Sequence, residues 1–172
     1  MIAQEYQDIE FIIIDDCSED ETASMILEWY SALSVFHQSK VKLVRNMENK
    51  GLPYNCNHAL DIARGRYIIR IDSDDYFMPN CLGTMVEYMK LDNIHGLISG
   101  FFECDEGLDE FEQKAPDYTH AGCAMFSRWA ANELRFKDGI EYLEGKEFFN
   151  RFKKSYQTTQ ITEPLWKYRQ HS

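Results

Sequence analysis

Short apolar runs recur along the first 100 residues, and each is followed by a segment in which apolar residues return with a helical period. Runs of this kind, rich in Ile, Val and Tyr, are typical of strands buried in a sheet. They predict strands at Glu10–Ile14, Val41–Val44, Arg66–Ile71 and Leu97–Phe102. The intervening segments predict helices at about Ser18–Phe36, Pro53–Arg64 and Asn80–Leu91. This alternation predicts an α/β domain with a mainly parallel sheet flanked by helices.

Local signals mark the expected helix boundaries. Ser18 followed by Glu21 matches a capping box, with Ser18 as the N-cap of the first helix. Pro53 suits the first position of the second helix, and Gly65 is typical of the position just after a helix end.

The rhythm of strands and helices becomes less regular from about residue 103. The acidic stretch 103–120 is expected to be a loop because it contains Gly107 and Pro116. The later pattern predicts a strand at Ala124–Phe126, helices at about Arg128–Leu134 and Gly145–Phe152, and an extended segment at Thr158–Trp166. No domain linker interrupts the chain, so residues 1–172 are expected to form a single domain.

The composition narrows the class of protein. With 172 residues, 44% of them hydrophobic, the chain is large enough to bury the core of one globular domain. A net charge of -11 argues against a nucleic-acid-binding protein, which usually carries a basic face. No apolar stretch reaches the roughly 18 residues of a membrane-spanning helix, and the polar first residues are unlike a secretory signal. The five scattered cysteines are interpreted as reduced thiols, so a cytoplasmic location is expected.

Three carboxylates follow the strand predicted at Arg66–Ile71, in the run Asp72-Ser73-Asp74-Asp75. Because like charges repel one another, a divalent cation such as Mg²⁺ or Mn²⁺ is the natural partner of this run. Such ions often bind through one or two carboxylates together with substrate phosphates. For an isolated acidic triplet, however, a solvated turn is the more frequent explanation.

A second acidic pair, Asp15-Asp16, follows the first predicted strand. Open α/β sheets bind ligands at the carboxyl ends of their strands, so both acidic segments are expected at one edge. A carboxylate there could accept hydrogen bonds from a base or a ribose hydroxyl. The loop after the second strand adds Arg45 and Lys50, which could meet a phosphate, and Gly51, which allows close approach of the backbone to a ligand.

Five stretches, taken in order from about Gln4 to His171, are similar to motifs of one known family. They are Gln4–Asp20, similar to a second strand with an Asp-Asp-Gly-Ser-x-Asp turn; Asn49–Asn57, similar to Asn-x-Gly…Asn; Ala63–Ile68, similar to Ala-x-Gly-x-Tyr-Ile; Asp72–Asp75, which matches the Asp-x-Asp metal motif; and Pro164–His171, similar to Pro-Leu-x-x-Tyr-Arg-x-His. The chain therefore resembles the inverting nucleotide-sugar glycosyltransferases of the large bacterial family with the GT-A fold, glycosyltransferase family 2.

The resemblance implies a site at the acidic edge of the sheet. Asp15 or Asp16 would hydrogen-bond the nucleotide base, and a divalent cation, Mn²⁺ or Mg²⁺, would bridge the diphosphate. The implied nucleotide-sugar-binding residues are Asp15, Asp16, Lys50, Gly51, Asn57, Asp72 and Asp74. The implied metal ligands are Asp72, Asp74, Asp75 and, in the last motif, His171. The cation would act as a Lewis acid for the leaving nucleoside diphosphate.

The implied reaction is transfer of a sugar from a nucleotide-diphosphate sugar to an acceptor hydroxyl with inversion, in the synthesis of a bacterial surface polysaccharide. The acceptor would be a carbohydrate or a lipid-linked sugar, which leaves open a peripheral contact with the inner face of the membrane and a homodimer. Residues 1–102 would form the nucleotide-sugar-binding half, and residues 103–172 would form the acceptor and catalytic half.

One departure from the family pattern concerns the catalytic base. In the family, the Asp of a Glu-Asp pair usually deprotonates the acceptor hydroxyl, whereas this chain has Gly145 in that place. Glu144 is therefore the candidate base, with Glu147 one turn later in reserve. Either carboxylate could instead be a favourable charge in the first turn of a helix.

A second departure concerns the start of the chain. Family members begin with an apolar strand that lies inside the sheet, and here Met1–Gln4 corresponds to the end of the helix after that strand. The expectation is an N-terminally truncated GT-A domain with a gapped sheet and weakened donor binding. An alternative is a nucleotide-sugar-binding module with impaired catalysis. Response-regulator receivers, haloacid-dehalogenase phosphatases and nucleotidyltransferases also use acidic residues after strands, but the chain lacks other residues that each class needs.

Overall fold

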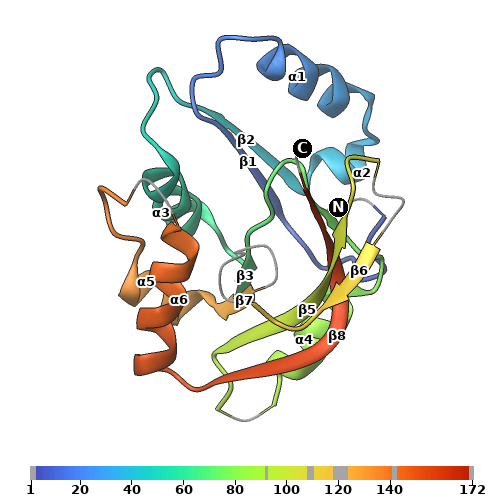
Figure 1. The fold of residues 1–172 in the computed structure, drawn as a ribbon. Coiled ribbons are helices and arrows are strands. Elements are labelled where there is room, and N and C mark those ends of the chain that lie inside the picture. Colours follow the sequence, from blue (N-terminus) through green and yellow to red (C-terminus); the bar gives the residue numbers. More distant parts are fainter. Residues whose placement is uncertain (1–2, 92, 108–110, 118–123, 141–142, 171–172) are drawn as a thin grey trace.

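A computed structural model describes residues 3–91, 93–107, 111–117, 124–140 and 143–170. Their strands form two sheets, with helices packed around them (Figure 1). The strands are β1 (Phe11–Asp15), β2 (Val41–Arg45), β3 (Tyr67–Ile69), β4 (Tyr76–Phe77), β5 (Gly96–Cys104), β6 (Phe111–Lys114), β7 (Ala124–Ser127) and β8 (Thr158–Arg169). The helices are α1 (Thr22–Ala32), α2 (Val35–Gln38), α3 (Leu52–Ile62), α4 (Cys81–Met89), α5 (Arg128–Leu134) and α6 (Glu144–Ser155).

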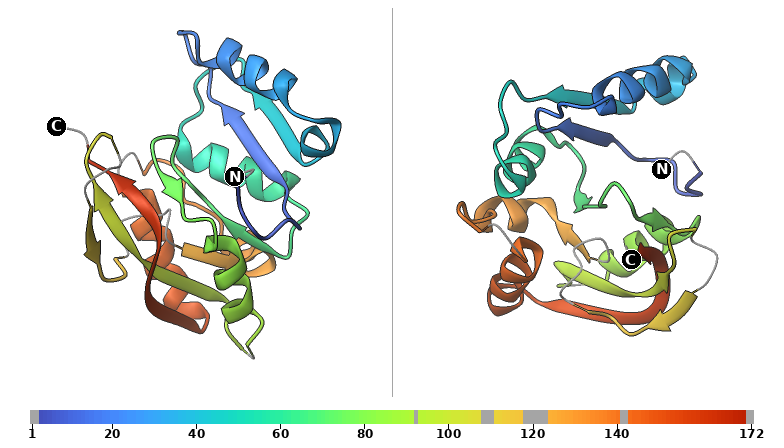
Figure 2. Two further views of the ribbon diagram at one scale, coloured as in Figure 1. Left: turned by 90° about the vertical axis from the view of Figure 1, so that its right-hand side faces the viewer. Right: turned by 45° about the horizontal axis from the view of Figure 1, so that its top comes forward.

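The smaller sheet consists of β1 and β2, which run parallel and are connected through α1 and α2. The larger sheet has the strand order β3-β7-β5-β8-β4, and β6 adds to β5. Figure 2 shows the β1–β2 pair and α1 lying to one side of the larger, curled sheet. Among the described strands none is hydrogen-bonded to both β1 and β3, so the two sheets are not joined to each other there.

The α/β class is confirmed, but the prediction of mainly parallel pairing is wrong. Only the β1–β2 and β5–β8 pairs are parallel among the described strands, whereas β3–β7, β5–β7, β5–β6 and β4–β8 are antiparallel. The prediction assumed that the alternation of strands and helices in the first half of the chain continues through the second half. In the second half, most paired strands are not connected by a helical crossover. Antiparallel strands can pair without such a crossover, whereas parallel strands need one.

The predicted start of the first helix is also wrong. The helix begins at Thr22, whose backbone N–H donates to Asp20 Oδ1 over 3.0 Å. Ser18 lies in the preceding turn, where its own backbone N–H donates to Asp15 Oδ1 over 3.0 Å. The predicted helix is further divided after Ala32, because Ser34 caps the short α2 by accepting a hydrogen bond from the His37 N–H.

The stretch predicted as a loop at 103–120 contains β6, which pairs with the second half of β5. The extended segment predicted at Thr158–Trp166 is a longer strand, β8. Pro164 is accommodated inside β8 because the β5–β8 register shifts beside it, at Gly100. A Cβ atom on Gly100 would lie 2.6 Å from the Thr162 carbonyl oxygen, so the two backbones approach too closely for any larger residue.

The hydrophobic core lies between the larger sheet and helices α4 and α6. Helix α6 buries Phe148, Phe149 and Phe152 on one face, and the ring centroid of Phe152 lies 4.7 Å from that of Phe126 on β7. Glu144 and Glu147 in its first turn and two lysines in its last turn suit the helix dipole. In contrast, α1 has no fully buried residue, so the β1–β2 part of the molecule is much less deeply packed.

Candidate active site

The carboxyl ends of β1 and β3 meet at the start of α3. Asn46 donates from Nδ2 to Asp16 Oδ1 and to Asn55 Oδ1, each over 2.7 Å, which joins the end of β1 to the first turns of α3. The next residue of that helix, Cys56, accepts a hydrogen bond from Arg70 Nη1 over 3.9 Å. The two acidic segments are therefore linked at one edge of the molecule, through α3.

Asp15 is buried and engaged by its neighbours. Its Oδ2 lies 3.1 Å from Arg45 Nε, and its Oδ1 accepts the hydrogen bond from the Ser18 N–H. Cys17 lies in the turn between Asp15 and Ser18 and has a left-handed backbone with φ of 65°, a conformation that favours glycine. This turn orients the side chain of Asp15 toward β2 and the next turn.

Asp16 organises the loop between β2 and α3. Besides Asn46, its carboxylate accepts the backbone N–H of Lys50 over 2.9 Å and that of Gly51 over 2.8 Å. Burial tends to raise the pKa of Asp16, but these hydrogen bonds lower the pKa overall because they stabilise the ionised form. Gly51 has a φ of 81° and precedes α3, so this residue type suits the sharp entry into the helix.

The other two predicted donor-binding residues of this region lie in different surroundings. Lys50 forms an ion pair with Glu48, and its Nζ lies 5.7 Å from the ring centroid of Tyr54. Asn57 donates from Nδ2 to the Phe136 carbonyl oxygen and accepts the Phe136 N–H through Oδ1, both over 2.9 Å. Asn57 therefore ties α3 to the segment that follows α5.

The acidic run after β3 forms a turn in which the Asp75 N–H donates to the Asp72 carbonyl oxygen over 3.2 Å. Asp75 Oδ1 accepts the backbone N–H of Arg169 over 3.2 Å, which joins this turn to the end of β8. Burial, followed by repulsion from Asp72 and Asp74, raises the pKa of Asp75 to about 7. The run therefore concentrates negative charge in a partly desolvated place.

Arg70 bridges the acidic turn to α6. Its Nη2 lies 3.0 Å from Asp72 Oδ1, and its Nη1 lies 2.6 Å from Glu144 Oε1. Burial lowers the pKa of a guanidinium, but the carboxylates of Asp72 and Glu144 hold the pKa of Arg70 above its ordinary value. The sequence interpretation overlooked Arg70, although a single arginine within the apolar run Tyr67–Ile71 is a signal that could have identified it.

The two candidate bases differ in their surroundings. Glu144 begins α6 directly after Leu143, which has a left-handed backbone with φ of 57°, and its side chain is 12% exposed beside Arg70. Glu147 instead receives two hydrogen bonds from Arg151 Nε, over 2.7 and 2.9 Å, and lies 2.9 Å from Lys137 Nζ. Of these two carboxylates, only Glu144 contacts Arg70, the guanidinium that also contacts Asp72.

The carboxylates fit a cation that binds together with a diphosphate better than a cation held by protein alone. Within the described part of the chain, no three His, Cys, Asp or Glu side chains are grouped as a ready-made metal cage. Mg²⁺-type sites usually need only one or two carboxylates, with substrate phosphates and water completing the shell. Burial, and after it repulsion from Asp72 and Asp74, raises the pKa of Asp75, and a bound divalent cation would relieve this repulsion. His171 lies outside the described residues.

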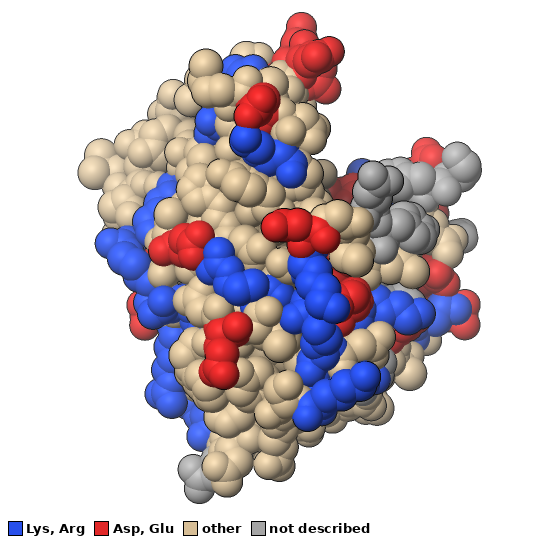
Figure 3. Space-filling view, turned by 90° about the vertical axis from the view of Figure 1, so that its left-hand side faces the viewer, with Lys and Arg blue, Asp and Glu red and all other residues tan. Residues whose placement is uncertain are grey.

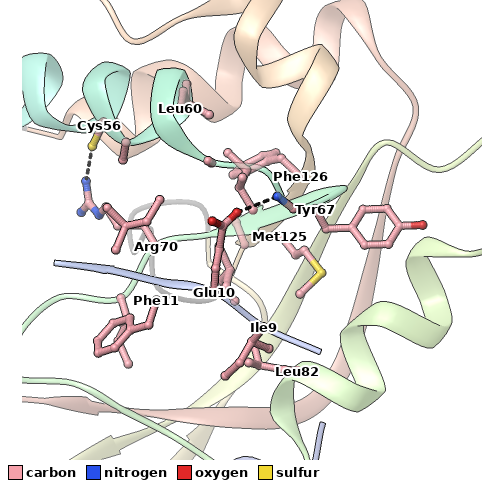
Figure 4. Close-up of a pocket in the computed structure, with 18 of the residues that line it drawn as sticks. Ile9, Glu10, Phe11, Cys56, Leu60, Tyr67, Arg70, Leu82, Met125 and Phe126 are labelled. Carbon is pink, nitrogen blue, oxygen red and sulfur yellow. Dashed lines mark hydrogen bonds between the residues drawn. The ribbon is translucent and has the colours of Figure 1, made fainter. Parts of the chain in front are cut away.

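A large cavity opens beside this edge, between the two sheets (Figure 4). Its volume is about 1500 Å³, and residues of β1, β3 and α3 line it along most of their length. Figure 4 shows Arg70 and Cys56 at one end of the view and Glu10 nearer to Tyr67. The site residues therefore border a hollow that extends deep between the sheets.

The face formed by α3, α5 and α6 carries interleaved basic and acidic side chains (Figure 3). Ion pairs account for part of this pattern, including Arg135 with Asp61 at 2.5 Å and Lys137 with Glu147. None of the helices in the described ranges is both long and apolar enough to cross a membrane.

Comparison with known proteins gives concordant matches. A model of the glycosyl transferase family 2 matches residues 1–164 of the chain. A UDP-Glc:alpha-D-GlcNAc-diphosphoundecaprenol beta-1,3-glucosyltransferase of Escherichia coli is 31% identical over 101 residues, which are 59% of this chain and 38% of that protein. A succinoglycan biosynthesis protein of Rhizobium meliloti is 33% identical over 86 residues, 50% of this chain and 23% of that protein. The chain thus matches well under half the length of these relatives.

Solved structures resemble the chain over nearly its whole length. S. aureus TarS 1-349 in complex with UDP-GlcNAc has a TM-score of 0.75 and 16% identity, covering 99% of this chain and 52% of that one. A mannosyltransferase from Pyrobaculum calidifontis in complex with GDP-Man and Mn²⁺ has a TM-score of 0.74 and 18% identity, covering 95% and 48%. At these identities the likeness shows a shared fold.

Proposed function

The chain belongs to glycosyl transferase family 2 and has the GT-A fold that its sequence predicts, and on this premise we propose that it binds a nucleotide-diphosphate sugar at the acidic edge and transfers the sugar, with inversion, to an acceptor hydroxyl. One observation carries the proposal. Arg70 joins Asp72, in the acidic turn, to Glu144, the candidate base, across 3.0 and 2.6 Å. The group proposed to bind the donor and the group proposed to accept the proton thus lie side by side.

The nucleotide would lie along the end of β1 and the start of α3. Asp15 and Asp16 are proposed to fix the base, Asp16 chiefly by holding the loop that carries Lys50 and Gly51. The Lys50 ammonium would meet the diphosphate after exchanging its ion pair with Glu48. Asn57 would support the site indirectly, through its two hydrogen bonds to the backbone of Phe136.

A divalent cation, Mn²⁺ or Mg²⁺, would be held by Asp72, Asp74 and Asp75, with His171 as a further proposed ligand. When bound, it would supply Lewis-acid stabilisation of the departing diphosphate. Asp72 also contacts Arg70, so its carboxylate would keep its orientation while the donor binds. Asp75 is anchored by the Arg169 N–H, which fixes one carboxylate of the set against the end of β8.

Glu144 is proposed as the base. Its carboxylate would accept the proton of the acceptor hydroxyl as that oxygen attacks the anomeric carbon, and the bonding pair to the diphosphate oxygen would leave with the nucleotide. Arg70 holds the carboxylate at the edge and balances its charge. Glu147 is less suited to this role because Arg151 and Lys137 already bind it.

Two of the similar proteins support a proposal for the donor and acceptor classes. One relative is named for UDP-glucose and a diphosphoundecaprenol-linked acceptor, and one solved structure contains UDP-GlcNAc. We therefore propose a uridine-diphosphate sugar as donor and a carbohydrate or lipid-linked acceptor, in surface-polysaccharide synthesis at the inner face of the membrane. Residues 1–102 would bind the donor, and residues 103–172 would bind the acceptor.

A second candidate is a nucleotide-sugar-binding module without turnover. Gly145 stands where a catalytic Asp is usual, and the sheet is interrupted between β1 and β3. Such a module would bind the donor with a cation but would not consume it.

A thermal-shift panel tests donor binding. Nucleoside diphosphates and their sugars are added with Mn²⁺, and a ligand present at 100 times its dissociation constant should raise the melting temperature by about 5–10 °C. We expect uridine diphosphates to give the largest shift, and we expect EDTA to remove it. If no nucleotide produces a cation-dependent shift, the proposed site is wrong.

A further inference from the structure

Three aromatic side chains, those of Trp129, His95 and Tyr156, pack together where β7 meets α5 and form what is here called the aromatic cluster. The ring centroid of Trp129 lies 5.1 Å from that of His95 and 5.4 Å from that of Tyr156, with interplanar angles of 79° and 88°. Trp129 is nevertheless 54% exposed, whereas the next two residues of α5, Ala130 and Ala131, are fully buried. The cluster therefore presents a tryptophan to the solvent.

The surrounding backbone and core hold the aromatic cluster in place. The backbone N–H of His95 donates to the Gln157 carbonyl oxygen over 2.9 Å, and the His95 carbonyl oxygen accepts the Ser127 N–H over 2.8 Å. Tyr156 packs against the buried Phe152, with ring centroids 4.8 Å apart. A surface whose side chains are already ordered loses less conformational entropy when a ligand binds. The cluster is therefore preorganised for binding.

A carboxylate lies beside the aromatic rings. Glu133 follows Trp129 by one turn of α5, so the two side chains lie on the same face of that helix. Burial, and after it a hydrogen bond with Glu133, raises the pKa of the Tyr156 phenol. The Glu133 carboxylate is thus held next to the cluster, and its remaining lone pairs can accept hydrogen bonds from a ligand. An aromatic ring beside such an acceptor suits a ligand that has both apolar faces and hydroxyl groups.

The aromatic cluster lies far from the acidic edge. Tyr156 precedes β8, whose 12 residues end at Arg169, the residue that anchors Asp75. A strand of that length covers a path of roughly 35 Å. Figure 1 shows the connection from α6 to β8 at the bottom of the molecule and the far end of β8 near the C mark. Trp129 likewise follows Ser127, which pairs with the first residue of β3, whereas the acidic turn follows the other end of β3. A ligand on the cluster would therefore lie apart from the proposed donor site.

We propose that the aromatic cluster and Glu133 form a saccharide-binding site that is separate from the acidic edge. In a β-linked glucose chain the hydroxyls lie around the rim of each ring, and C–H groups form its two faces. Such a face would stack on the Trp129 indole, because an aromatic face carries partial negative charge. The hydroxyls would donate to the Glu133 carboxylate. The choice of a saccharide rests on the proposed function, in which the acceptor is a carbohydrate. A long acceptor held here would stay close to the domain while its end reaches the acidic edge.

A quaternary ammonium ion is the other class of ligand that groups of aromatic rings recognise. Such an ion is enclosed between several rings. In the aromatic cluster the rings contact one another, with centroids 5.1 to 6.0 Å apart, and leave no space between them for a cation. The geometry therefore favours stacking of a saccharide on the exposed Trp129, and choline serves as the competing ligand in the test.

The test is an NMR titration of the isotope-labelled chain with cellotriose, a β-linked glucose trisaccharide, in EDTA and without nucleotide. The indole N–H signals of the three tryptophans, Trp29, Trp129 and Trp166, are followed, and Trp129→Phe identifies the signal of Trp129. We expect the Trp129 signal to shift saturably, with a dissociation constant on the order of 1 mM for so shallow a site. The signal of Trp166, which is 1% exposed, should not move. No saturable shift of the Trp129 signal, or a shift with choline and none with cellotriose, would overturn the proposal.

Variants locate the binding on the aromatic cluster, with backbone amide signals as the readout. Trp129→Ala should weaken cellotriose binding about tenfold, the order expected for the loss of one stacked ring. Glu133→Ala, at an exposed position, should weaken it about threefold or more and serves in its place if Trp129→Ala fails to fold. Phe36→Ala is the matched control, because Phe36 is an aromatic residue that is 60% exposed on α2, and it should leave the affinity unchanged. Equal affinities of all these variants for cellotriose would contradict a site at Trp129.

The same proteins separate this inference from the proposed function. Trp129→Ala should bind UDP with Mn²⁺ as the unmodified chain does, because the aromatic cluster lies apart from the acidic edge. Cellotriose binding that depends on Trp129, in a chain that binds no nucleotide, would support the saccharide site and refute the donor site. Nucleotide binding without any cellotriose binding would support the donor site and refute the saccharide site.

Discussion

Replacing Asp75 with asparagine is expected to stabilise the ligand-free protein at pH 8 and to abolish cation-dependent nucleotide binding. Burial and the neighbouring Asp72 and Asp74 raise the pKa of Asp75 to about 7, so ionising this carboxyl in the fold is unfavourable. Asparagine retains an oxygen that can accept the Arg169 N–H, and it carries no charge. It also removes an anionic ligand that a divalent cation would need.

The sign of the pH dependence follows from proton binding. An unfolded Asp has a pKa of about 3.9, so between about pH 4 and pH 7 the folded state holds a proton that the unfolded state has released. The free energy of unfolding therefore falls as the pH rises through this range, by an amount on the order of 2–4 kcal/mol from this one group. The Asp75→Asn protein should lack this loss.

Urea unfolding at pH 5, 6, 7 and 8 measures the effect in the presence of EDTA. The stability difference between Asp75→Asn and the unmodified chain should be small at pH 5 and should grow towards pH 8. Asp138→Asn, at an exposed position, is the matched control and should show no such trend. A stability difference that is the same at all four pH values would contradict the raised pKa.

Replacing Glu144 with glutamine is expected to reduce sugar transfer by about 10²–10⁴-fold while leaving donor affinity nearly unchanged. Glutamine can still accept a hydrogen bond from Arg70, but it cannot take up the proton of the acceptor hydroxyl. The assay measures transfer and hydrolysis of a labelled nucleotide sugar, and calorimetry measures donor binding in parallel.

Glu147→Gln is the matched control because it changes the same residue type one turn along α6. It should weaken the contacts with Arg151 and Lys137 and lower stability, with little effect on the rate per folded molecule. A large rate loss for Glu147→Gln alone would transfer the role of base to Glu147. If the unmodified chain binds the donor and shows no turnover, the binding-module interpretation is correct.

The sequence predicts the order of elements well where the local pattern is strong. The apolar run before Asp72 and the proline-started helix after Gly51 both appear close to their predicted positions. β6 could not be predicted, because the residues 111–114 lack a clear alternation and owe their strand to pairing with β5. Antiparallel pairing in the second half likewise depends on long-range contacts that short local patterns do not encode.

The candidate site could likewise be predicted only in part. Sequence motifs locate the acidic residues, but they do not reveal which carboxylates already have hydrogen-bond partners within the protein. The motif predicts Asp16 as a ligand-binding residue, whereas in the structure its carboxylate holds the loop before α3 by accepting the Lys50 and Gly51 backbone N–H groups. The hydrogen bond from Arg70 to Glu144 joins residues 74 positions apart in the chain, so it could be identified only from the folded structure.

The most direct test of the central claim is a calorimetric titration of the protein with UDP, with Mn²⁺ and with EDTA in its place. We expect UDP to bind only with Mn²⁺, and we expect Asp74→Ala to lose at least tenfold in affinity, about 1.4 kcal/mol. Asp138→Ala should bind as the unmodified chain does. Equal UDP affinity in EDTA, or an unchanged affinity for Asp74→Ala, would contradict the claim that this acidic edge binds a nucleoside diphosphate through a divalent cation.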